Sequence, residues 1–331
     1  MATTVPGLVS VILPNRNHAH YLPTALDALL AQTWPQLEIL LVDDASSDNS
    51  REVMRSYATR DRRVRLIELG EHIGINRAVE LARGQARGEY LYMAAADDFV
   101  APTFFETSVG MLQQYQSAGL CFSDPTEFYE ADNRTIRFPL YLSSDPVHYD
   151  PSDFQLVLTR NYFHISSNTA IYRADMFQDA GGYRAELGWL SDWFVTLVVA
   201  LRNGACYVPI ALTFLRLCNA SFSAMTAKDT RSHRQPFDRF LTLLAQPAYA
   251  DVARAMQRSG VLPEYRFRTL RWLLQSRQGR TFLSRHLVVR IVSRSVWSYL
   301  RPLAPYWLRR SLRKYVSHKT MTDDREFGRA A

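Results

Sequence analysis

Two adjacent carboxylates, Asp97 and Asp98, follow a short apolar run at residues 90–96. A run of this length predicts a buried strand, which would deliver both acids to one edge of a sheet. In open α/β sheets, ligands bind in the crevice outside the carboxyl ends of the strands. Two hard oxygen ligands at that edge suit a divalent cation that bridges phosphate groups. The alternative is an Asp-Asp turn that only caps a helix start, with Pro102 in the first turn.

The elements that would position these acids can be predicted from the alternation of apolar runs. Runs at residues 8–13, 37–42 and 64–69 predict three further strands, and helical spacings lie between them. Strands and helices that alternate at this length indicate a parallel, right-handed, doubly wound sheet. We therefore expect an α/β fold with a mainly parallel central sheet flanked by helices. The chain contains neither the Gly-rich dinucleotide fingerprint nor a P-loop, so a nucleotide would be held in another way.

Four motifs in the first hundred residues resemble those of the inverting glycosyltransferases of the large family 2, which have the GT-A fold. In chain order they are Val9-Ser10-Val11-Ile12-Leu13-Pro14-Asn15-Arg16-Asn17, Glu38-Ile39-Leu40-Leu41-Val42-Asp43-Asp44-Ala45-Ser46-Ser47-Asp48, Gly88-Glu89-Tyr90 and Ala95-Ala96-Asp97-Asp98. The resemblance implies that the turn after the first strand and the second Asp of the Val-Asp-Asp motif contact a base and ribose. It also implies that the acids after the fourth strand hold the cation and diphosphate of a sugar nucleotide.

Carried over by position, the resemblance implicates Pro14, Asn15, Arg16, Asn17, Asp44, Asp97 and Asp98. We expect Asn76 and Arg77 to bind the donor as well. The resemblance places a metal site, for Mg²⁺ or Mn²⁺, at Asp97 and Asp98. For Asp43 and Asp44 the alternative is that they cap the next helix.

A second part of the resemblance covers Gly181-Gly182-Tyr183 and residues 188–193. In the family, an acid at the start of the following helix removes the proton from the acceptor hydroxyl, and Asp192 occupies that position. One base on the acceptor side is sufficient for direct displacement at an anomeric carbon. The alternative for Asp192 is a helix N-cap. Trp189 and Trp193 could stack on a sugar ring or lie in the core.

Three residues depart from the family pattern: Ala95, Cys218 and Glu80. Cys218 stands where many members have a histidine, and a thiol is a poor ligand for a hard cation. Dependence on a divalent cation is therefore open, because Arg77 or Arg216 could neutralise the diphosphate instead. The histidines near the start of the first helix, His18 and His20, are expected to be exposed.

Residues 124–165 form a long polar stretch that is rich in aromatic side chains. Stretches of this length inside a compact domain are commonly lids or binding loops. We expect contacts to the acceptor in this part of the chain.

The 331-residue chain is 47% apolar, as expected of a globular protein with a substantial core. Its three cysteines lack a metal-ligand spacing, which suggests reduced thiols in the cytoplasm. The sequence shows neither a signal-peptide pattern at its start nor an apolar run long enough to span a membrane. We therefore expect a cytoplasmic location.

Charged side chains are distributed unevenly along the chain. Residues 1–264 carry 23 basic and 29 acidic side chains, whereas residues 265–322 carry 14 basic and none acidic. We expect a GT-A catalytic domain at 1–223, with a nucleotide-sugar half at about 1–100 and an acceptor half at 101–223. A basic helical region would follow at 224–331.

The segment 280–318 of this basic region has the composition of an interfacial helix pair. On a helical wheel, Val288, Val289, Val292, Val296, Tyr299 and Leu300 gather on one side, and Arg290, Arg294 and Arg301 on the other. This pattern predicts peripheral binding to the anionic inner face of the plasma membrane. The alternative is that the apolar stripe packs back on the protein. Nucleic acid is not an expected partner, since no recognised binding module accompanies the charge.

Together these patterns predict an inverting, hexosyltransferase-like enzyme that moves a sugar from a nucleotide donor to a hydroxyl of a glycan or lipid-linked acceptor. Cell-surface polysaccharide biosynthesis is the expected setting. One alternative is a catalytically inactive homologue that binds nucleotide sugars or serves as a scaffold. Another is a nucleotidyltransferase on a related fold, which the lack of a Gly-rich phosphate loop makes the weaker hypothesis.

Overall fold

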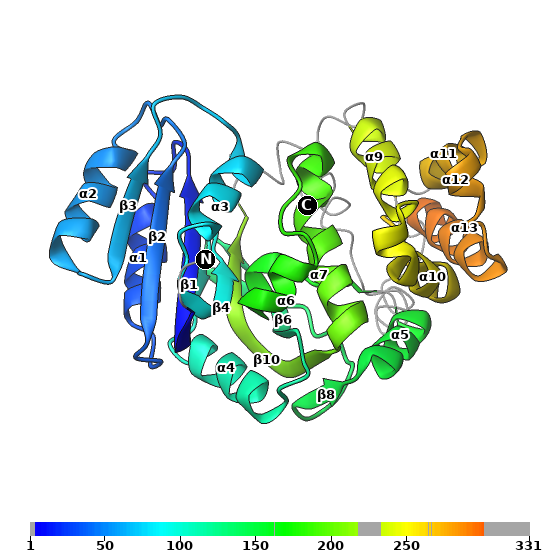
Figure 1. The fold of residues 1–331 in the computed structure, drawn as a ribbon, viewed down its shortest axis with the longest axis horizontal. Helices are drawn as coiled ribbons and strands as arrows, with labels where there is room; N and C mark the ends of the chain where they lie inside the picture. Colours follow the sequence, from blue (N-terminus) through cyan, green and yellow to red (C-terminus); the bar gives the residue numbers. More distant parts are fainter. Residues whose placement is uncertain (1–3, 162, 218–232, 264, 266, 301–331) are drawn as a thin grey trace. The chain divides into compact units, whose positions relative to one another are not determined.

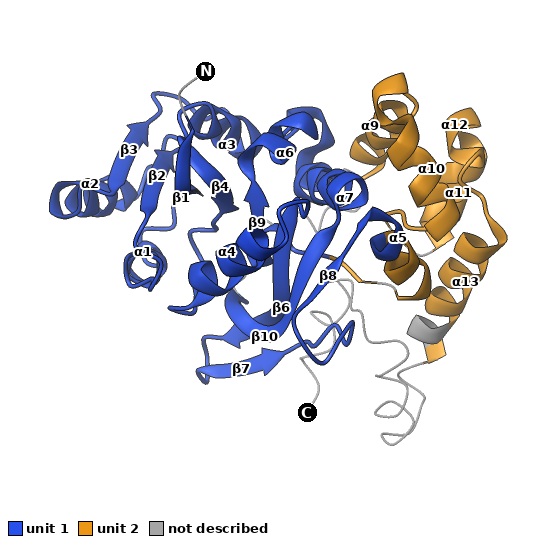
Figure 2. Cartoon of the chain, turned by 60° about the horizontal axis from the view of Figure 1, so that its bottom comes forward, with its two compact units in different colours: residues 1–154, 165–221 blue, residues 155–164, 222–331 orange. Residues whose placement is uncertain are grey.

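The computed structural model of the chain describes residues 4–161, 163–217, 233–263, 265 and 267–300 (Figure 1). These residues belong to two compact units (Figure 2). The first unit comprises residues 1–154 and 165–221, and the second comprises residues 155–164 and 222–331.

The first unit is built on one sheet, in which 10 strands are found among the described residues. The main path has the order β3-β2-β1-β4-β9-β6-β10-β5, while β7 pairs with β6 and β8 with β10. The strands are β1 (Val5–Asn15), β2 (Leu37–Asp43), β3 (Val64–Glu68), β4 (Gly88–Met93), β5 (Phe99–Val100), β6 (Leu120–Tyr129), β7 (Arg134–Arg137), β8 (Val147–Tyr149), β9 (Ala170–Arg173) and β10 (Ala205–Arg216).

The half of the sheet formed by β1 to β4 is parallel throughout, as the sequence predicted. Strands β1 to β4 pair only in parallel with one another, and all seven residues of β2 are buried. Such continuous burial is typical of a strand covered on both faces. The other half is mixed, because β9 runs antiparallel to both β4 and β6. The prediction of an α/β fold with a central sheet is confirmed.

Helices flank this sheet (Figure 1). They are α1 (Leu22–Leu30), α2 (Ser50–Arg60), α3 (Ile75–Arg83), α4 (Phe104–Gln114), α6 (Ala174–Asp179) and α7 (Ser191–Asn203), with 3-10 turns η1 (Ser167–Thr169) and η2 (Ala185–Leu190). Helix α5 (Pro151–Arg160) begins in the first unit and ends in the second. In α1, the apolar residues Leu22, Leu26 and Leu29 are buried, and Leu30 is half-buried. They join the core cluster formed with β1, β2 and β4.

The polar stretch at 124–165 is more regular than the sequence suggested. Strand β6 continues to Tyr129 and forms a hairpin with β7, and β8 pairs with β10. Helix α5 follows. Aromatic and β-branched residues in this stretch supply strand pairing, so it is not one long loop.

The second unit is helical where it is described. Its elements are α9 (Arg234–Leu244), η3 (Pro247–Tyr249), α10 (Ala250–Ser259), α11 (Phe267–Gln275), α12 (Arg277–Arg280) and α13 (Arg285–Leu300). Phe237, Tyr265 and Trp272 make ring contacts at its centre. Across the described part of the chain, every helix is too short or too polar to cross a bilayer.

Candidate active site

The ends of β1 and β2 lie side by side, because parallel pairing aligns Asn15 with Asp43. Polar contacts join the turns that follow. The Oδ1 atom of Asn17 accepts a hydrogen bond from the Ser47 N–H at 2.7 Å, and the Asn17 N–H donates to Ser46 Oγ at 3.0 Å. The φ of Asn17 is 59°, a left-handed value that asparagine tolerates better than most residues. Two groups of predicted donor residues therefore meet at one sheet edge.

The remaining predicted residues of the first turn differ in exposure. Asn15 is 3% exposed, its Nδ2 lies 3.2 Å from Ser46 Oγ, and its Oδ1 has no partner among the described residues. Pro14 is half-buried and Arg16 is exposed. Of these three, Arg16 presents a charge to solvent.

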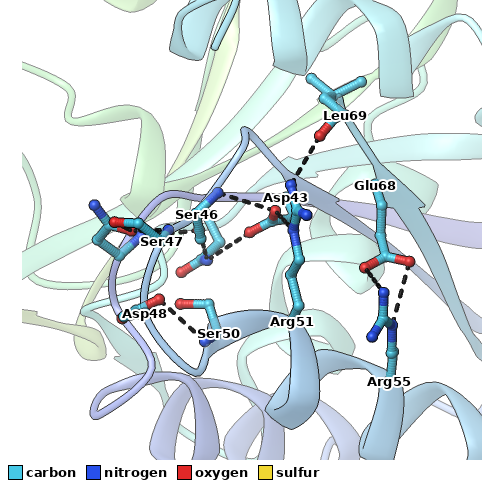
Figure 3. Close-up of polar contacts among 11 residues, drawn as sticks. Asp43, Ser46, Ser47, Asp48, Ser50, Arg51, Arg55, Glu68 and Leu69 are labelled. Carbon is cyan, nitrogen blue, oxygen red and sulfur yellow. Dashed lines mark hydrogen bonds and ion pairs between the residues drawn. The ribbon is translucent and has the colours of Figure 1, made fainter. Parts of the chain in front are cut away.

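The carboxylate of Asp43 is fully buried and paired with Arg51 (Figure 3). Arg51 Nε lies 2.7 Å from Oδ2, and the Ser46 N–H donates to the same oxygen at 3.1 Å. Burial alone raises the pKa of Asp43, but hydrogen bonds from Ser46 and Arg51 outweigh it and hold the pKa below its ordinary value. Arg51 also donates to the Leu69 carbonyl at 3.0 Å. Asp43 is thus a structural acid that ties β2, α2 and β3 together.

Asp44 is also buried but holds a different segment, the loop between β3 and α3. Its oxygens accept hydrogen bonds from the N–H groups of Ile73 (2.7 Å) and Gly74 (3.0 Å), and His72 Nδ1 lies 2.7 Å from Oδ2. His72 itself is exposed. The sequence identified Asp44 but not His72, because 28 residues separate the two in the chain.

Helix α3 carries the next predicted donor residues and fixes a second loop. Asn76 Nδ2 donates to the Gly188 carbonyl at 2.8 Å, and Arg77 is exposed. Glu80 accepts a hydrogen bond from the Tyr183 N–H at 2.7 Å and pairs with Arg83. The departure of Glu80 from the family pattern therefore has a structural role, since it anchors the Gly-Gly loop.

The Asp97-Asp98 turn lies between β4 and β5. Asp98 is half-buried; its Oδ2 accepts from Asn168 Nδ2 at 2.5 Å and its Oδ1 accepts from the Arg216 N–H at 2.8 Å. Burial, together with the charge of Asp97, raises the pKa of Asp98 to about 8, despite these hydrogen bonds. Asp97 is itself 9% exposed. Two acids crowded in this way favour a cation beside them.

Arg216 supports this turn from β10. Its Nε donates to the Asp97 carbonyl at 3.0 Å, and its Nη1 pairs with Glu130 at 2.8 Å. The guanidinium also lies 5.0 Å and 4.9 Å from the ring centroids of Tyr21 and Phe128. Because these contacts occupy a side chain that is only 9% exposed, Arg216 is a support for the turn as it stands and not a solvent-facing phosphate ligand.

Asp192 is the second residue of α7 and is half-buried. Its Oδ1 accepts from the N–H of Trp193 at 2.7 Å, and its Oδ2 accepts from Ser167 Oγ at 3.2 Å. The residue that precedes α7 is Leu190, so Asp192 satisfies an N–H of the first turn without being the N-cap. Trp193 is 9% exposed and belongs to the core, whereas Trp189 is half-buried.

The turn η1 contacts both acid positions, a feature that the sequence did not reveal. Ser167 donates to Asp192, and its neighbour Asn168 donates to Asp98. These contacts join residues 25 and 70 positions apart, which no local pattern could indicate.

Asp97 and Asp98 fit a divalent cation that takes its other ligands from diphosphate and water. The described residues contain no group of three or more His, Cys, Asp and Glu side chains that could hold a metal ion. Cys218 lies outside those residues. Mg²⁺ commonly binds through one or two carboxylates plus substrate phosphates. A cation would oppose the effects of burial and of the Asp97 charge, which together raise the Asp98 pKa.

This sheet, with acids at its carboxyl edge, is that of the GT-A class of glycosyltransferases. S. aureus TarS 1-349, solved in complex with UDP-GlcNAc, superposes with a TM-score of 0.63 at 15% identity, over 89% of this chain and 86% of that chain. The protein belongs to glycosyl transferase family 2, whose pattern matches residues 10–181. The predicted family and fold are confirmed.

Curated relatives are bacterial. Escherichia coli YibD, an uncharacterized glycosyltransferase, is 33% identical over 243 residues, which are 69% of this chain and 64% of YibD. Streptococcus pneumoniae glycosyltransferase GlyG is 29% identical over 46% of this chain and 50% of its own. Bacillus subtilis TuaG, a putative teichuronic acid biosynthesis glycosyltransferase, is 34% identical over 28% of this chain and 36% of its own. The matched region therefore spans between about a third and two thirds of these relatives.

Proposed function

We propose that this protein transfers a sugar from a nucleoside-diphosphate donor to an acceptor hydroxyl, with inversion at the anomeric carbon. The observation that carries the proposal is that one turn, η1, donates a hydrogen bond to each of the two acids that the reaction needs. Direct displacement requires a base on the acceptor side and charge neutralisation on the leaving-group side.

In this reaction Asp192 accepts the proton of the attacking hydroxyl. Ser167 orients its carboxylate. Asp97 and Asp98 would hold Mg²⁺ or Mn²⁺, and the cation would supply neutralisation of the diphosphate. Arg16 and Arg77, both exposed, are the basic side chains of the donor residues that could approach the phosphates. Asp44 acts by fixing the 72–74 loop against the ribose and base.

The donor is a nucleotide sugar, and the acceptor is a glycan or lipid-linked glycan of cell-surface polysaccharide biosynthesis. The TarS complexes with UDP-GlcNAc and UDP support a sugar-nucleotide donor. The printed role of TuaG in teichuronic acid biosynthesis supports a polysaccharide setting.

A catalytically inactive, nucleotide-sugar-binding protein is the second candidate. The lack of a complete metal-ligand group among the described residues, with Ala95 in the acidic turn, favours it. Both candidates predict binding of nucleoside diphosphates, so only a measurement of turnover distinguishes them.

The test is thermal shift with UDP, GDP, CDP and ADP, with and without Mn²⁺, followed by release of nucleoside diphosphate from the matching sugar nucleotides. The proposal predicts stabilisation by at least one nucleotide, greater with Mn²⁺, and measurable release. Stabilisation without release from any donor, with glycan or lipid-linked acceptors present, would favour the inactive homologue. No stabilisation and no release would contradict both candidates.

We also propose peripheral attachment to an anionic membrane on its cytoplasmic face through the basic region. On α13, Val289, Val292, Val296 and Leu300 are 38–59% exposed and share one face. Arg290 points the other way and donates to the carbonyls of Gly260 and Ser259 at 3.0 and 3.2 Å. The exposed apolar stripe supports this attachment, since such stripes bury area at a membrane interface.

A further inference from the structure

We propose that Ser167 and Asn168 are positioning residues that act as a pair, so that one short turn sets the acceptor-side acid and the leaving-group-side acid together. The proposal rests on the proposed function, because it assigns both residues to the geometry of that reaction. It extends that function to two uncharged side chains.

The turn η1 is rigid enough for this task. Thr169 Oγ1 and the Thr169 N–H both donate to the Ser166 carbonyl, at 2.8 and 2.9 Å. The Asn168 carbonyl accepts from Tyr92 Oη, at 3.1 Å, and Tyr92 is a buried residue of β4. Asn168 is 9% exposed. The turn is therefore fixed to the strand that leads into the acidic pair.

Asn168 is oriented as a donor toward Asp98. Its Oδ1 accepts from Ser166 Oγ at 2.5 Å, which leaves Nδ2 to face Asp98 Oδ2. With the Arg216 N–H on the other oxygen, the carboxylate of Asp98 is held from two sides. Hydrogen bonds to charged groups are stronger than those between neutral groups. Loss of the Asn168 hydrogen bond should therefore leave the Asp98 carboxylate less well positioned to bind a cation.

Ser167 holds Asp192 in the same manner. Its hydroxyl donates to Oδ2, while the Trp193 N–H occupies Oδ1. The main chain at Asp192 is fixed as well, since Thr196 Oγ1 donates to its carbonyl at 2.7 Å and contacts Tyr172 Oη at 2.7 Å. Without Ser167, one oxygen of the carboxylate would lose an oriented donor.

Tyr172 of β9 and Tyr183 of the Gly-Gly loop are the titratable groups whose ionisation Asp192 affects. Burial first, and then the negative charge of Asp192, raise the pKa of both phenols. Neither phenol should ionise in the acid range, but the carboxylates of both Asp192 and Asp98 could give an acid limb in the rate. The contribution of Asp192 is the part that Ser167→Ala shifts and Asn168→Ala does not, because Asn168 contacts Asp98 instead. A hydrogen bond to a carboxylate lowers its pKa, so removing the Ser167 hydroxyl should move that limb to higher pH.

The experiment compares full-length Ser167→Ala and Asn168→Ala with the wild-type protein. Binding is measured calorimetrically with Mn²⁺ and whichever of UDP, GDP, CDP and ADP binds most tightly, and turnover is measured as a pH profile of kcat with the matching sugar nucleotide. Asn168→Ala should weaken binding of the Mn²⁺–nucleotide pair by about 10-fold. Ser167→Ala should leave that binding within about 2-fold, lower kcat and shift the acid limb upward.

Two further variants control the comparison. Ser167→Thr keeps the hydroxyl and should restore the wild-type acid limb. Ser123→Ala removes a buried hydroxyl that lacks a hydrogen-bond partner among the described residues, and should change neither binding nor the pH profile.

An unshifted acid limb in Ser167→Ala would overturn the proposal. So would equal losses of binding and kcat in both η1 variants, since that pattern indicates a general structural effect. These outcomes leave the proposed function standing if the wild-type protein binds and turns over. If Asn168→Ala does not fold, the Ser167 variants still decide the matter. A wild-type protein with no binding and no turnover would contradict the proposed function and this pair together.

Discussion

The four acids at the sheet edge differ in their hydrogen-bond partners, and these partners indicate which role each acid has. Asp43 is paired with Arg51 inside the protein, and Asp44 is bonded to the 72–74 loop. Burial, and then the charge of the neighbouring Asp97, raise the pKa of Asp98 to about 8. Asp43 therefore stabilises the fold, whereas Asp97 and Asp98 form a crowded acidic pair beside which a cation would be favoured.

The Asp43–Arg51 pair predicts a pH-dependent loss of stability in Arg51→Met. Removing Arg51 would leave the fully buried Asp43 carboxylate without its ion-pair partner, so Arg51→Met should lower the free energy of unfolding at neutral pH. The folded-state pKa of Asp43 is lowered, so its contribution is present above the unfolded value of about 3.9 and is lost as pH falls through the folded value.

Denaturant unfolding of both proteins at neutral pH and at about pH 3 measures this effect. The difference between wild type and Arg51→Met should shrink on acidification. Arg55→Met on the same helix is the matched control: its partner Glu68 is 32% exposed, and such pairs contribute at most about 1 kcal/mol. Equal losses in the two variants would contradict the assignment of Asp43 as a buried structural acid.

At the scale of elements, the sequence was sufficient to predict those strands whose structure is determined by neighbouring residues. The apolar runs predicted β1 to β4, and parallel pairing then brought the ends of β1 and β2 together. The contacts of η1 could not be predicted, because they depend on β9 inserting between β4 and β6. The roles of His72 and Glu80 could not be predicted either, because each side chain contacts a segment that is distant in the chain.

The Gly-Gly loop predicts a strong asymmetry between two glycine substitutions. Gly182 has a φ of +63°, and a Cβ there would lie 2.7 Å from Glu80 Oε1. Gly110, inside α4, would place a Cβ in open space. Gly182→Ala should lower the free energy of unfolding by more than about 1 kcal/mol, whereas Gly110→Ala should raise it by roughly 0.5–1 kcal/mol.

Thermal unfolding of the two variants tests this account of the loop. The losses in Gly182→Ala and in Glu80→Ala should not add in the double variant, because without the Glu80 side chain the clash disappears while the strained φ remains. If Gly182→Ala were as stable as wild type, that result would contradict the close packing of this loop against α3.

At the scale of the whole molecule, the charge and the apolar exposure of the basic region support the proposed attachment to a membrane. Residues 265–322 contain 14 basic and no acidic side chains. The helical-wheel prediction placed Arg290 opposite the valines, and the structure agrees but gives Arg290 protein partners. Part of the predicted segment, 301–318, lies outside the described residues. The exposed valines of α13 are therefore the residues to substitute in a test of the membrane proposal.

Val289→Asp/Val296→Asp in the full chain should reduce co-sedimentation with vesicles of phosphatidylserine and phosphatidylcholine. Two charges on the apolar face would oppose insertion and repel the anionic surface. Ile210→Asp, at an exposed position of β10, is the control and should sediment as wild type. Raised salt should weaken wild-type binding. Equal sedimentation of the double variant and wild type would remove α13 from the membrane proposal.

The central claim, that Asp192 is the base of a sugar transfer, is tested most directly by Asp192→Asn. Asp175→Asn is the matched control, because Asp175 also accepts the N–H of the next residue in a first helical turn, at 2.8 Å, and is exposed. Turnover of the sugar nucleotide in Asp192→Asn should fall by about 10²-fold or more, with nucleoside-diphosphate affinity unchanged within about 2-fold. Turnover near the wild-type rate in Asp192→Asn would contradict the claim.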